Sequence, residues 1–473
     1  MNAITSDLKA VKKKGGLITA KERQRLLLPA LLFTLYLFAF LLTEFTVNEK
    51  CAAVLGKESV TAVYALGIIC TSAGYGGFYL SRTLIKSEGK RRLIIAAFAF
   101  AYLIAAPCFM FASGALLFVI SAFSALFLFG YIGGFTHYAA SLFLFGEKHS
   151  GKVIGGAVAL AVLLQFIVQN LLVTDIALIV SLFLSVGGIC YLAAKPVGDW
   201  LFENPLNHAE KPLVTAKILI LPICIVAVMS MCHGLGDGVI TQLHAAGAIN
   251  LASYSRLWYA ASAFGAGVIS DMFERRLLPL CTLCMLVLFS TMALFIGQEN
   301  AAANNLYVVA VYIFSGFYVM YLTVTFSDSA PLSAKPDLWA GMGRIVRGIF
   351  IGLTAAISNP LFESIGQQGL VIAGICLSLL VLVLFVAGGA LNIIPEKKTE
   401  NSRDRLPGFI ASYSLTPREG EVLAQLLVGK HTNADIAKEL AISVRVLQRY
   451  IASIYEKARV QSRAGLIKLY YEN

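Results

Sequence analysis

The sequence predicts an all-α protein, a polytopic bundle of membrane helices followed by a small helical domain. Of the 473 residues, 58% are hydrophobic and only 14% are charged, and the mean hydropathy is +0.76. This composition is too apolar for an ordinary soluble protein. The apolar stretches are each about 20 residues long, enough to cross a hydrocarbon core of roughly 30 Å as helices. The sequence lacks the alternating pattern of an outer-membrane barrel.

Twelve stretches are candidate membrane spans. A polar segment with prolines and charges, residues 195–216, divides them into two sets of six. The sequence therefore predicts a first membrane half over 26–194, this central loop, and a second membrane half over 217–391. The spans lie near residues 26–48, 60–81, 93–113, 115–141, 153–173, 176–194, 217–245, 253–270, 277–297, 303–327, 339–361 and 369–391.

The distribution of Lys and Arg predicts the orientation. With residues 1–25, which are polar and basic, placed in the cytoplasm, the inner segments hold 20 Lys and Arg, whereas the outer ends hold only Lys50, Lys57 and Arg256. Because Lys and Arg resist translocation, this imbalance places the N-terminus inside. An even number of spans returns the C-terminus to the same side.

A short loop in each half has a related pattern. The second half has "GVISDMFERRLLP" from Gly267, and the first half has the looser "GFYLSRTLIKSEGKRR" from Gly77, with Ser81 at the position of the acid. These loops resemble those of the major facilitator superfamily, whose halves each carry a G-x-x-x-D-x-x-x-R-R loop on the cytoplasmic side. We expect the glycine to allow close helix approach and the acid to pair with an arginine. The alternative is a basic loop that serves topology only. The residues concerned are Gly267, Asp271, Arg275 and Arg276.

A charged, Pro-containing linker over 392–413 precedes a separate domain over 414–473. In that domain Thr416, with Glu419 three residues later, forms a capping box and predicts a helix that begins at Pro417. Gly429 supplies its stop. The next helix begins after Thr432, with Asp435 three residues on.

A third helix follows Ser443. It carries an apolar stripe at helical spacing, Leu447, Ile451, Ile454 and Ala458, which we expect to be buried. The side chains that we expect to face outwards are Arg445, Gln448, Arg449 and Ala452. Two short helices, a tight turn and a longer helix with basic and amide side chains near its start describe a helix-turn-helix.

This segment closely resembles the LuxR/NarL-type DNA-binding domain, a four-helix fold. The resemblance rests on L-T-x-R-E-x-E-V-L from Leu415, I-A-x-x-L-x-I-S from Ile436 and I-Y-x-K-x-x-V-x-S-R-A-x-L from Ile454. It implies binding to double-stranded DNA and pairing of two such domains through the last helix, 462–471. The alternative is a domain that has lost DNA binding and serves as a protein contact. The candidate DNA-binding residues are Arg445, Gln448, Arg449, Ala452, Thr432, Lys457 and Arg463.

Gln448 stands where the family usually has a lysine, with Arg449 beside it. Gln pairs well with adenine and Arg with guanine in the major groove, so we expect binding with an altered sequence preference.

Ionisable residues inside apolar spans mark candidate cavities, because a charge in hydrocarbon is costly. Counted from the inner ends of their spans, Glu44, His233, Asp237 and Arg256 reach a similar outer level. By resemblance to facilitators, spans one, four, seven and ten line a central cavity. The alternative is that Glu44 and Asp237 lie at the water interface. Three tyrosines of span ten are candidate aromatic walls, Tyr312, Tyr318 and Tyr321.

Two further polar features have weaker claims on function. Arg344 and Arg347 are expected to be snorkelling or topology residues, and the alternative is that they form part of an inner gate. His137 has no visible partner and is expected to be structural.

The sequence therefore predicts a membrane-embedded, one-component transcription regulator in the bacterial cytoplasmic membrane, with both termini cytoplasmic. Its expected partners are double-stranded DNA, a small-molecule effector, the lipid bilayer and a second copy of the C-terminal domain. The alternative is a transporter of the major-facilitator type with a fused regulatory tail. Because no nucleophile motif, metal cluster or phosphate-binding loop is found, we expect no enzyme activity, no metal and no cofactor.

Overall fold

The computed structural model describes residues 20–144, 147–194, 216–298, 300–388, 405–427 and 433–458, together with 460, 466 and 469–470. Within these residues every regular element is a helix and no strand is found, so the predicted all-α class is confirmed. The chain forms two compact units. We call the helices up to residue 388 the bundle, and those from residue 405 onward the C-terminal domain.

The described part of the bundle contains eleven α-helices, joined in part by short 3₁₀ turns. The helices of the first half are α2 (Ala20–Val54), α3 (Val60–Leu84), α4 (Glu88–Met110), α5 (Ala115–Phe143), α6 (Ser150–Leu171) and α7 (Asp175–Ala194). Those of the second half are α8 (Ala216–Ala246), α9 (Leu257–Met272), α10 (Leu277–Met292), α11 (Ala301–Ser329) and α12 (Pro336–Ala387).

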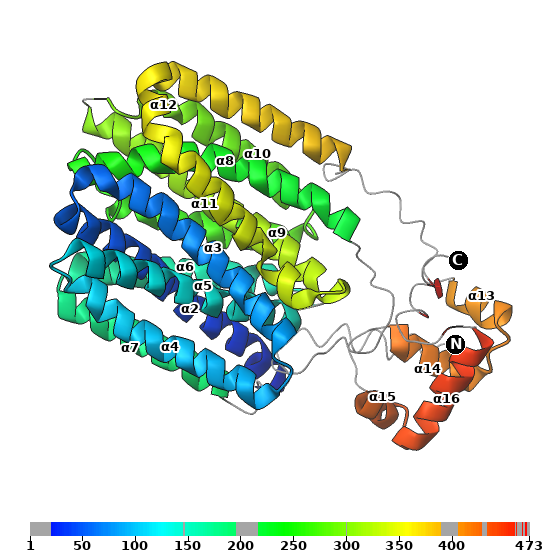
Figure 1. Cartoon of the computed structure of the whole chain (residues 1–473). Helices are drawn as coiled ribbons and strands as arrows, with labels where there is room; N and C mark the ends of the chain where they lie inside the picture. Colours follow the sequence, from blue (N-terminus) through cyan, green and yellow to red (C-terminus); the bar gives the residue numbers. More distant parts are fainter. Residues whose placement is uncertain are drawn as a thin grey trace. The chain divides into compact units, whose positions relative to one another are not determined.

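The twelve expected spans all fall on these helices, although only ten described helical segments are long and apolar enough to cross a membrane. One difference is α9, which has only 16 residues. The other is α12, a run of 52 residues that covers two expected spans and is interrupted by non-helical backbone at Gly366. Its two arms turn back on each other like a hairpin (Figure 1).

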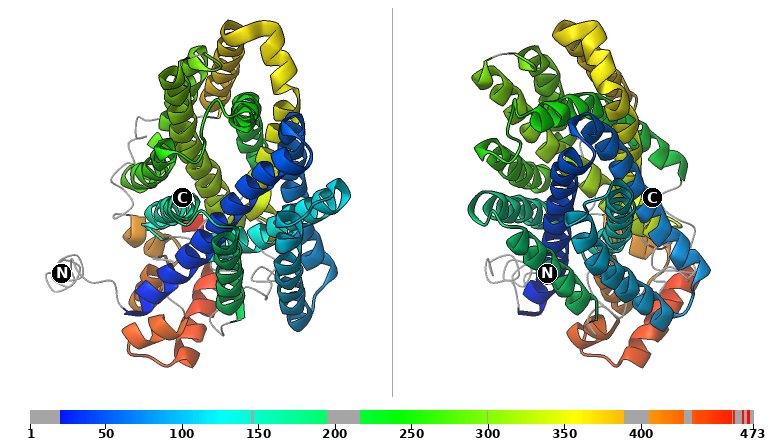
Figure 2. Two further views of the ribbon diagram at one scale, coloured as in Figure 1. Left: turned by 90° about the vertical axis from the view of Figure 1, so that its left-hand side faces the viewer. Right: turned by 60° about the vertical axis from the view of Figure 1, so that its left-hand side comes forward.

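The two halves occupy different sides of the bundle. Figures 1 and 2 show α2 to α7, in blue to teal, on one side and α8 to α12, in green to yellow, on the other. The most extensive contacts between the halves join α3 to α12 and α6 to α9. These two helix pairs therefore control how the halves fit together.

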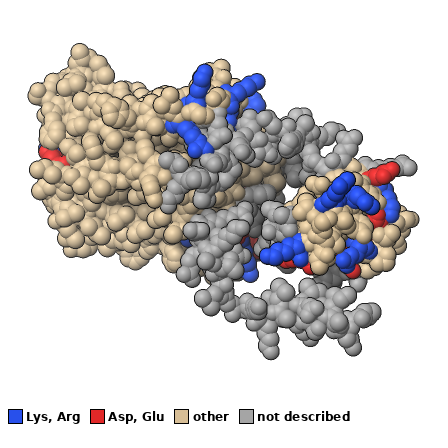
Figure 3. All heavy atoms as spheres, turned by 90° about the horizontal axis from the view of Figure 1, so that it is seen from below, with Lys and Arg blue, Asp and Glu red and all other residues tan. Residues whose placement is uncertain are grey.

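The outer surface of the bundle is apolar. The face in Figure 3 shows a broad area of the bundle without Lys, Arg, Asp or Glu, with red atoms at one end and blue atoms toward the other. Soluble proteins rarely expose large apolar patches of this kind, and a lipid environment would cover them. Large side chains that are more than half exposed include Leu84, Leu93, Phe100, Leu116, Ile176 and Leu184.

The C-terminal domain has its own hydrophobic core. Its described helices are α13 (Arg405–Ser412), α14 (Pro417–Leu427), α15 (Asn433–Glu439) and α16 (Val444–Lys457). The helix α13 was not expected, because its residues were assigned to the linker. Its Phe409 is buried against the rings of Tyr413 and Tyr470, so the core begins earlier than the sequence pattern indicated.

The expected capping residues start two of these helices. The Thr416 backbone N–H donates to Glu419 Oε2 over 2.7 Å, and the Glu419 N–H donates to Thr416 Oγ1 over 3.3 Å, which confirms the capping box. At α16, Ser443 Oγ accepts from the Val446 N–H over 3.3 Å. The expected signals at Gly429 and Thr432 lie outside the described residues.

Candidate functional site

The exposed face of α16 is the candidate DNA-binding surface. Leu447 and Ile454 are fully buried on the opposite side of the helix, which sets its rotation. The outward positions are three or four residues apart and lie on one helical face. As expected from this spacing, the exposed residues include Arg445, Gln448, Arg449 and Ala452.

Lys457 differs from the other candidates, because its ammonium group binds other residues of its own domain. Its Nζ lies 2.7 Å from Glu419 Oε2 and donates to the Ser414 carbonyl over 3.3 Å. Ser453 donates to the other oxygen of Glu419 over 2.6 Å. Lys457 therefore ties α16 to the start of α14, which is a structural role. Thr432 and Arg463 lie outside the described residues.

Glu419 is the centre of this contact and is 4% exposed. Burial alone would raise the pKa of its carboxyl group. The hydrogen bonds from Lys457, Ser453 and Thr416 outweigh burial and lower that pKa to about 2. The carboxylate is therefore ionised over the physiological pH range.

A small cavity of about 130 Å³ lies between the two halves of the bundle. Helices α2, α3 and α6 of the first half line it, together with α8, α9, α11 and α12 of the second. Five of the seven expected ligand-site residues line this cavity, namely Glu44, His233, Asp237, Arg256 and Tyr312.

Two of the cavity's charged groups have neighbours that position them. Tyr64 donates to Asp237 Oδ2 over 2.8 Å, and His233 Nε2 lies 3.4 Å from Asp237 Oδ1. Across the cavity, Arg256 donates to Gln169 over 2.8 Å and to the Tyr312 hydroxyl over 3.3 Å. Asp237 and Arg256 are therefore held in place by protein groups.

Tyr318 and Tyr321 do not line the cavity, and the expectation that they form its walls is wrong. Tyr318 lies behind His233, with 5.8 Å between ring centroids, and its hydroxyl bonds Ser230. Tyr321 packs on Phe385 at 5.7 Å. The reason is the helical period of α11, which turns positions nine residues apart to opposite faces.

The expectation for Arg347 is also wrong, because it lines the cavity instead of snorkelling to the surface. Arg344, one turn earlier, donates to His137 Nε2 over 3.2 Å. His137, for which no partner was visible, also bonds Tyr75 and the Gly133 carbonyl. Two arginines three residues apart on one face of an apolar helix were the available signal for an interior role.

A larger surface hollow of about 720 Å³ lies beside the cavity and shares Phe45 with it. Its charged side chains are paired. Lys50 lies 3.2 Å from Asp175, and His244 Nε2 lies 2.9 Å from Glu49. We call this hollow the vestibule.

The expected loop of the second half joins the two halves. A Cβ atom on Gly267 would lie 2.4 Å from the Gly151 carbonyl oxygen, so glycine permits the contact between α9 and α6. Asp271 accepts from the backbone N–H groups of Gly151 and Lys152, over 2.9 and 2.7 Å, at the start of α6. Arg275 bonds the same carboxylate. Its companion Arg276 is exposed.

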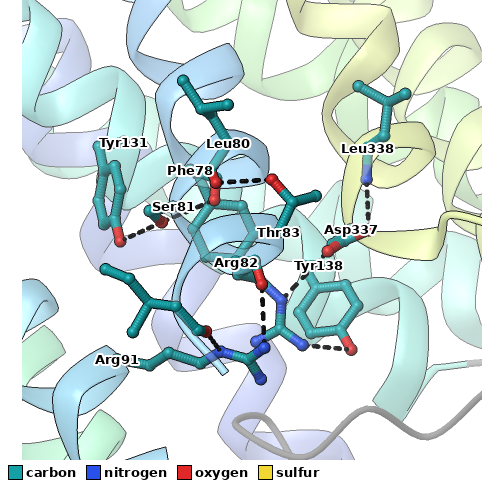
Figure 4. Close-up of polar contacts among 11 residues, drawn as sticks. Phe78, Leu80, Ser81, Arg82, Thr83, Arg91, Tyr131, Tyr138, Asp337 and Leu338 are labelled. Carbon is teal, nitrogen blue, oxygen red and sulfur yellow. Dashed lines mark hydrogen bonds and ion pairs between the residues drawn. The ribbon is translucent and has the colours of Figure 1, made fainter. Parts of the chain in front are cut away.

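The loop of the first half uses a partner from the other half. Arg82 Nε lies 3.3 Å from Asp337 Oδ2, in the first turn of α12, and Arg82 Nη2 donates to Tyr138 (Figure 4). Ser81, which replaces the acid, instead bonds the Tyr131 hydroxyl over 2.8 Å. Both loops therefore connect the halves, although only the second does so with its own carboxylate.

The comparisons with known proteins concern the C-terminal part of the chain. Residues 413–470 match the family described as "Bacterial regulatory proteins, luxR family". A relative described as "Probable transcriptional regulator ycf29", from Cyanophora paradoxa, is 36% identical over 78 residues. That match covers 16% of this chain and 37% of the relative's length. The C-terminal segment thus resembles the luxR family of bacterial regulatory proteins.

Proposed function

We propose that this chain is a membrane-embedded, one-component transcription regulator. The bundle senses a small molecule, and the C-terminal domain binds double-stranded DNA. The observation that carries the proposal is the presence, on one chain, of a luxR-family domain and an apolar helical bundle with a charged cavity between its halves. The luxR match favours a regulator over a transporter.

The proposed mechanism is a shift between two arrangements of the halves. A ligand in the cavity touches both halves, so it favours the arrangement in which it contacts both of them at once. The contacts of Asp271 with α6 and of Arg82 with Asp337 join the halves as well. The arrangement of the halves then changes how the C-terminal domains pair or are released on DNA.

DNA contact is assigned to the exposed face of α16. Arg449 and Gln448 are the candidate base-reading residues, with Arg445 and Ala452 beside them. Because each domain offers a small surface, two copies acting together are expected, and confinement to a bilayer raises their local concentration.

The test uses the full chain in lipid nanodiscs and the DNA that flanks its gene. We expect retention of specific fragments over competitor DNA, with affinity that falls as salt rises. Removing residues 405–473 should abolish retention and should change transcript levels of the flanking genes. Equal transcript levels with and without this segment would refute the proposal.

A second variant tests sensing. Cell extract or growth medium that changes transcription through the wild-type protein supplies the effector. Asp237→Asn should weaken this transcriptional response without lowering the protein level. Glu363→Gln, an exposed change on α12 away from the cavity residues, is the control.

A further inference from the structure

The charged groups that line the cavity balance. Two carboxylates, Glu44 and Asp237, face two guanidinium groups, Arg256 and Arg347. In a medium of low dielectric constant, an added net charge would remain uncompensated and would be costly. The cavity therefore suits a ligand whose own charges sum to zero.

The four charges are not equally engaged. Asp237 is held by Tyr64 and His233, and Arg256 by Gln169 and Tyr312, as described above. Among the residues that the structure describes, Glu44 has no hydrogen-bond partner, although it interacts electrostatically with Arg347.

Other polar atoms at the cavity lack partners too. Arg347 Nε is buried and unpaired, as is Nδ1 of His233, whose residue is only 2% exposed. Buried polar atoms are rarely left unpaired, and such groups in a cavity indicate a missing partner. One end of the missing partner is an acceptor for Arg347, and the other is a donor for Glu44.

The size of the cavity limits the ligand. A volume of about 130 Å³ is many times the roughly 10–15 Å³ that one water molecule requires. Sites for drug-sized molecules begin at about 300 Å³. The ligand is therefore about as large as an amino acid.

We propose that the cavity binds a small zwitterion of amino-acid size, with its carboxylate on Arg347 and its ammonium group on Glu44. This inference rests on the proposed sensing function and names the chemical class of its effector. Glu44 lies on α2 of the first half and Arg347 on α12 of the second. The ligand thus joins the halves by two charge-assisted contacts, which gives it different affinities for the two arrangements.

The experiment measures the melting temperature of the full chain in nanodiscs. The probes are the standard L-amino acids, taurine and γ-aminobutyrate, each at millimolar concentration. For each hit, the amide (a cation) and the N-acetyl derivative (an anion) are compared with it. A ligand that binds only the folded state raises the melting temperature. We expect at least one zwitterion to do so, and both of its blocked derivatives to bind at least about tenfold more weakly.

Charge variants provide a matched second test. Glu44→Gln leaves the cavity one positive charge in excess and should shift preference toward the N-acetyl derivative. Arg347→Gln should shift it toward the amide. If either variant fails to fold, the wild-type comparison of the zwitterion with its blocked forms still decides the question.

The inference is overturned if no zwitterion raises the melting temperature, or if a blocked derivative binds the wild-type chain as well as its parent. DNA retention measured on the same samples separates this failure from failure of the proposed function. Retained DNA without zwitterion binding leaves a regulator with another effector class, whereas loss of both refutes the regulator.

Discussion

Arg82 on α3 and Asp337 at the start of α12 form an ion pair between the two halves, with 3.3 Å between Nε and Oδ2. Both side chains are largely buried, at 4% and 15% exposure. The partners are 255 residues apart in the chain. The pair therefore depends on how α3 packs against α12.

Removing either partner of this pair should destabilise the bundle. Asp337→Asn and Arg82→Gln each leave a charge in a poorly solvated site, and we expect a loss of about 3 kcal/mol. The double variant should lose less than the sum of the two, because the charges then disappear together. Thermal unfolding in nanodiscs measures this, with the exposed Glu363→Gln as control. Additive losses would show that the pair does not couple the halves.

The second prediction concerns the close packing of α6 against α9. Gly267→Ala places a Cβ atom 2.4 Å from the Gly151 carbonyl, so it should force the helices apart and lower the melting temperature. Gly265→Ala, on the same helix with no atom within 4 Å of its added Cβ, should be neutral or stabilising by up to about 1 kcal/mol. Similar behaviour of the two variants would contradict the packing described here.

DNA-binding assays should distinguish the outward-facing residues of α16 from Lys457, which binds Glu419. Gln448→Ala and Arg449→Ala should each weaken specific binding by about 1–3 kcal/mol and leave the melting temperature unchanged. Lys457→Ala should lower the melting temperature, since it leaves Glu419 without its cation. Gel-shift and thermal-unfolding measurements on the same samples give both values. Glu456→Gln, also exposed on this helix, is the control and should not weaken binding.

Acid should destabilise the C-terminal domain through Glu419. Its pKa is about 2 in the folded domain, below the value of about 4.3 of an unfolded chain. The stabilisation is therefore complete above about pH 4.3 and is lost as the pH falls toward 2. Chemical unfolding of residues 400–473, which contain α13 and the whole core cluster, measures this.

The matched variants for this pH effect are Glu419→Gln and Glu421→Gln. Glu419→Gln should lower the free energy of unfolding by about 2 kcal/mol at neutral pH. The stability of this variant should also depend less on pH below about pH 4.3. Glu421 is exposed and pairs with Arg418 at the surface, so its variant should follow the wild type. If the free energy of unfolding of Glu419→Gln falls at low pH as steeply as that of the wild type, other groups cause the acid sensitivity.

Much of the architecture followed from local sequence patterns. Helix positions in the bundle follow from runs of apolar residues as long as a bilayer core, and α16 follows from Ser443 and the spacing of Leu447 and Ile454. The capping pair at Thr416 is likewise contained within four residues. Where local patterns were weak, the expectation failed, as at α13, whose apolar residues are surrounded by charge and proline.

The partners of charged side chains could not be deduced in this way. The pairing of Asp271 with Arg275 was expected, but its contact with the start of α6 was not. His137 with Arg344, Lys457 with Glu419, and the orientation of Tyr321 away from the cavity depend on helix rotation and on which helices are neighbours.

The sequence alone determined the helices, their apolar character and the similarity of the C-terminal domain to the luxR family. Each of these depends on residues that lie only a few positions apart in the sequence. The tertiary structure decided which charged side chains share a cavity and which ones join the halves. Such contacts bring together residues far apart in the chain, and their geometry depends on the packing of all the helices between them.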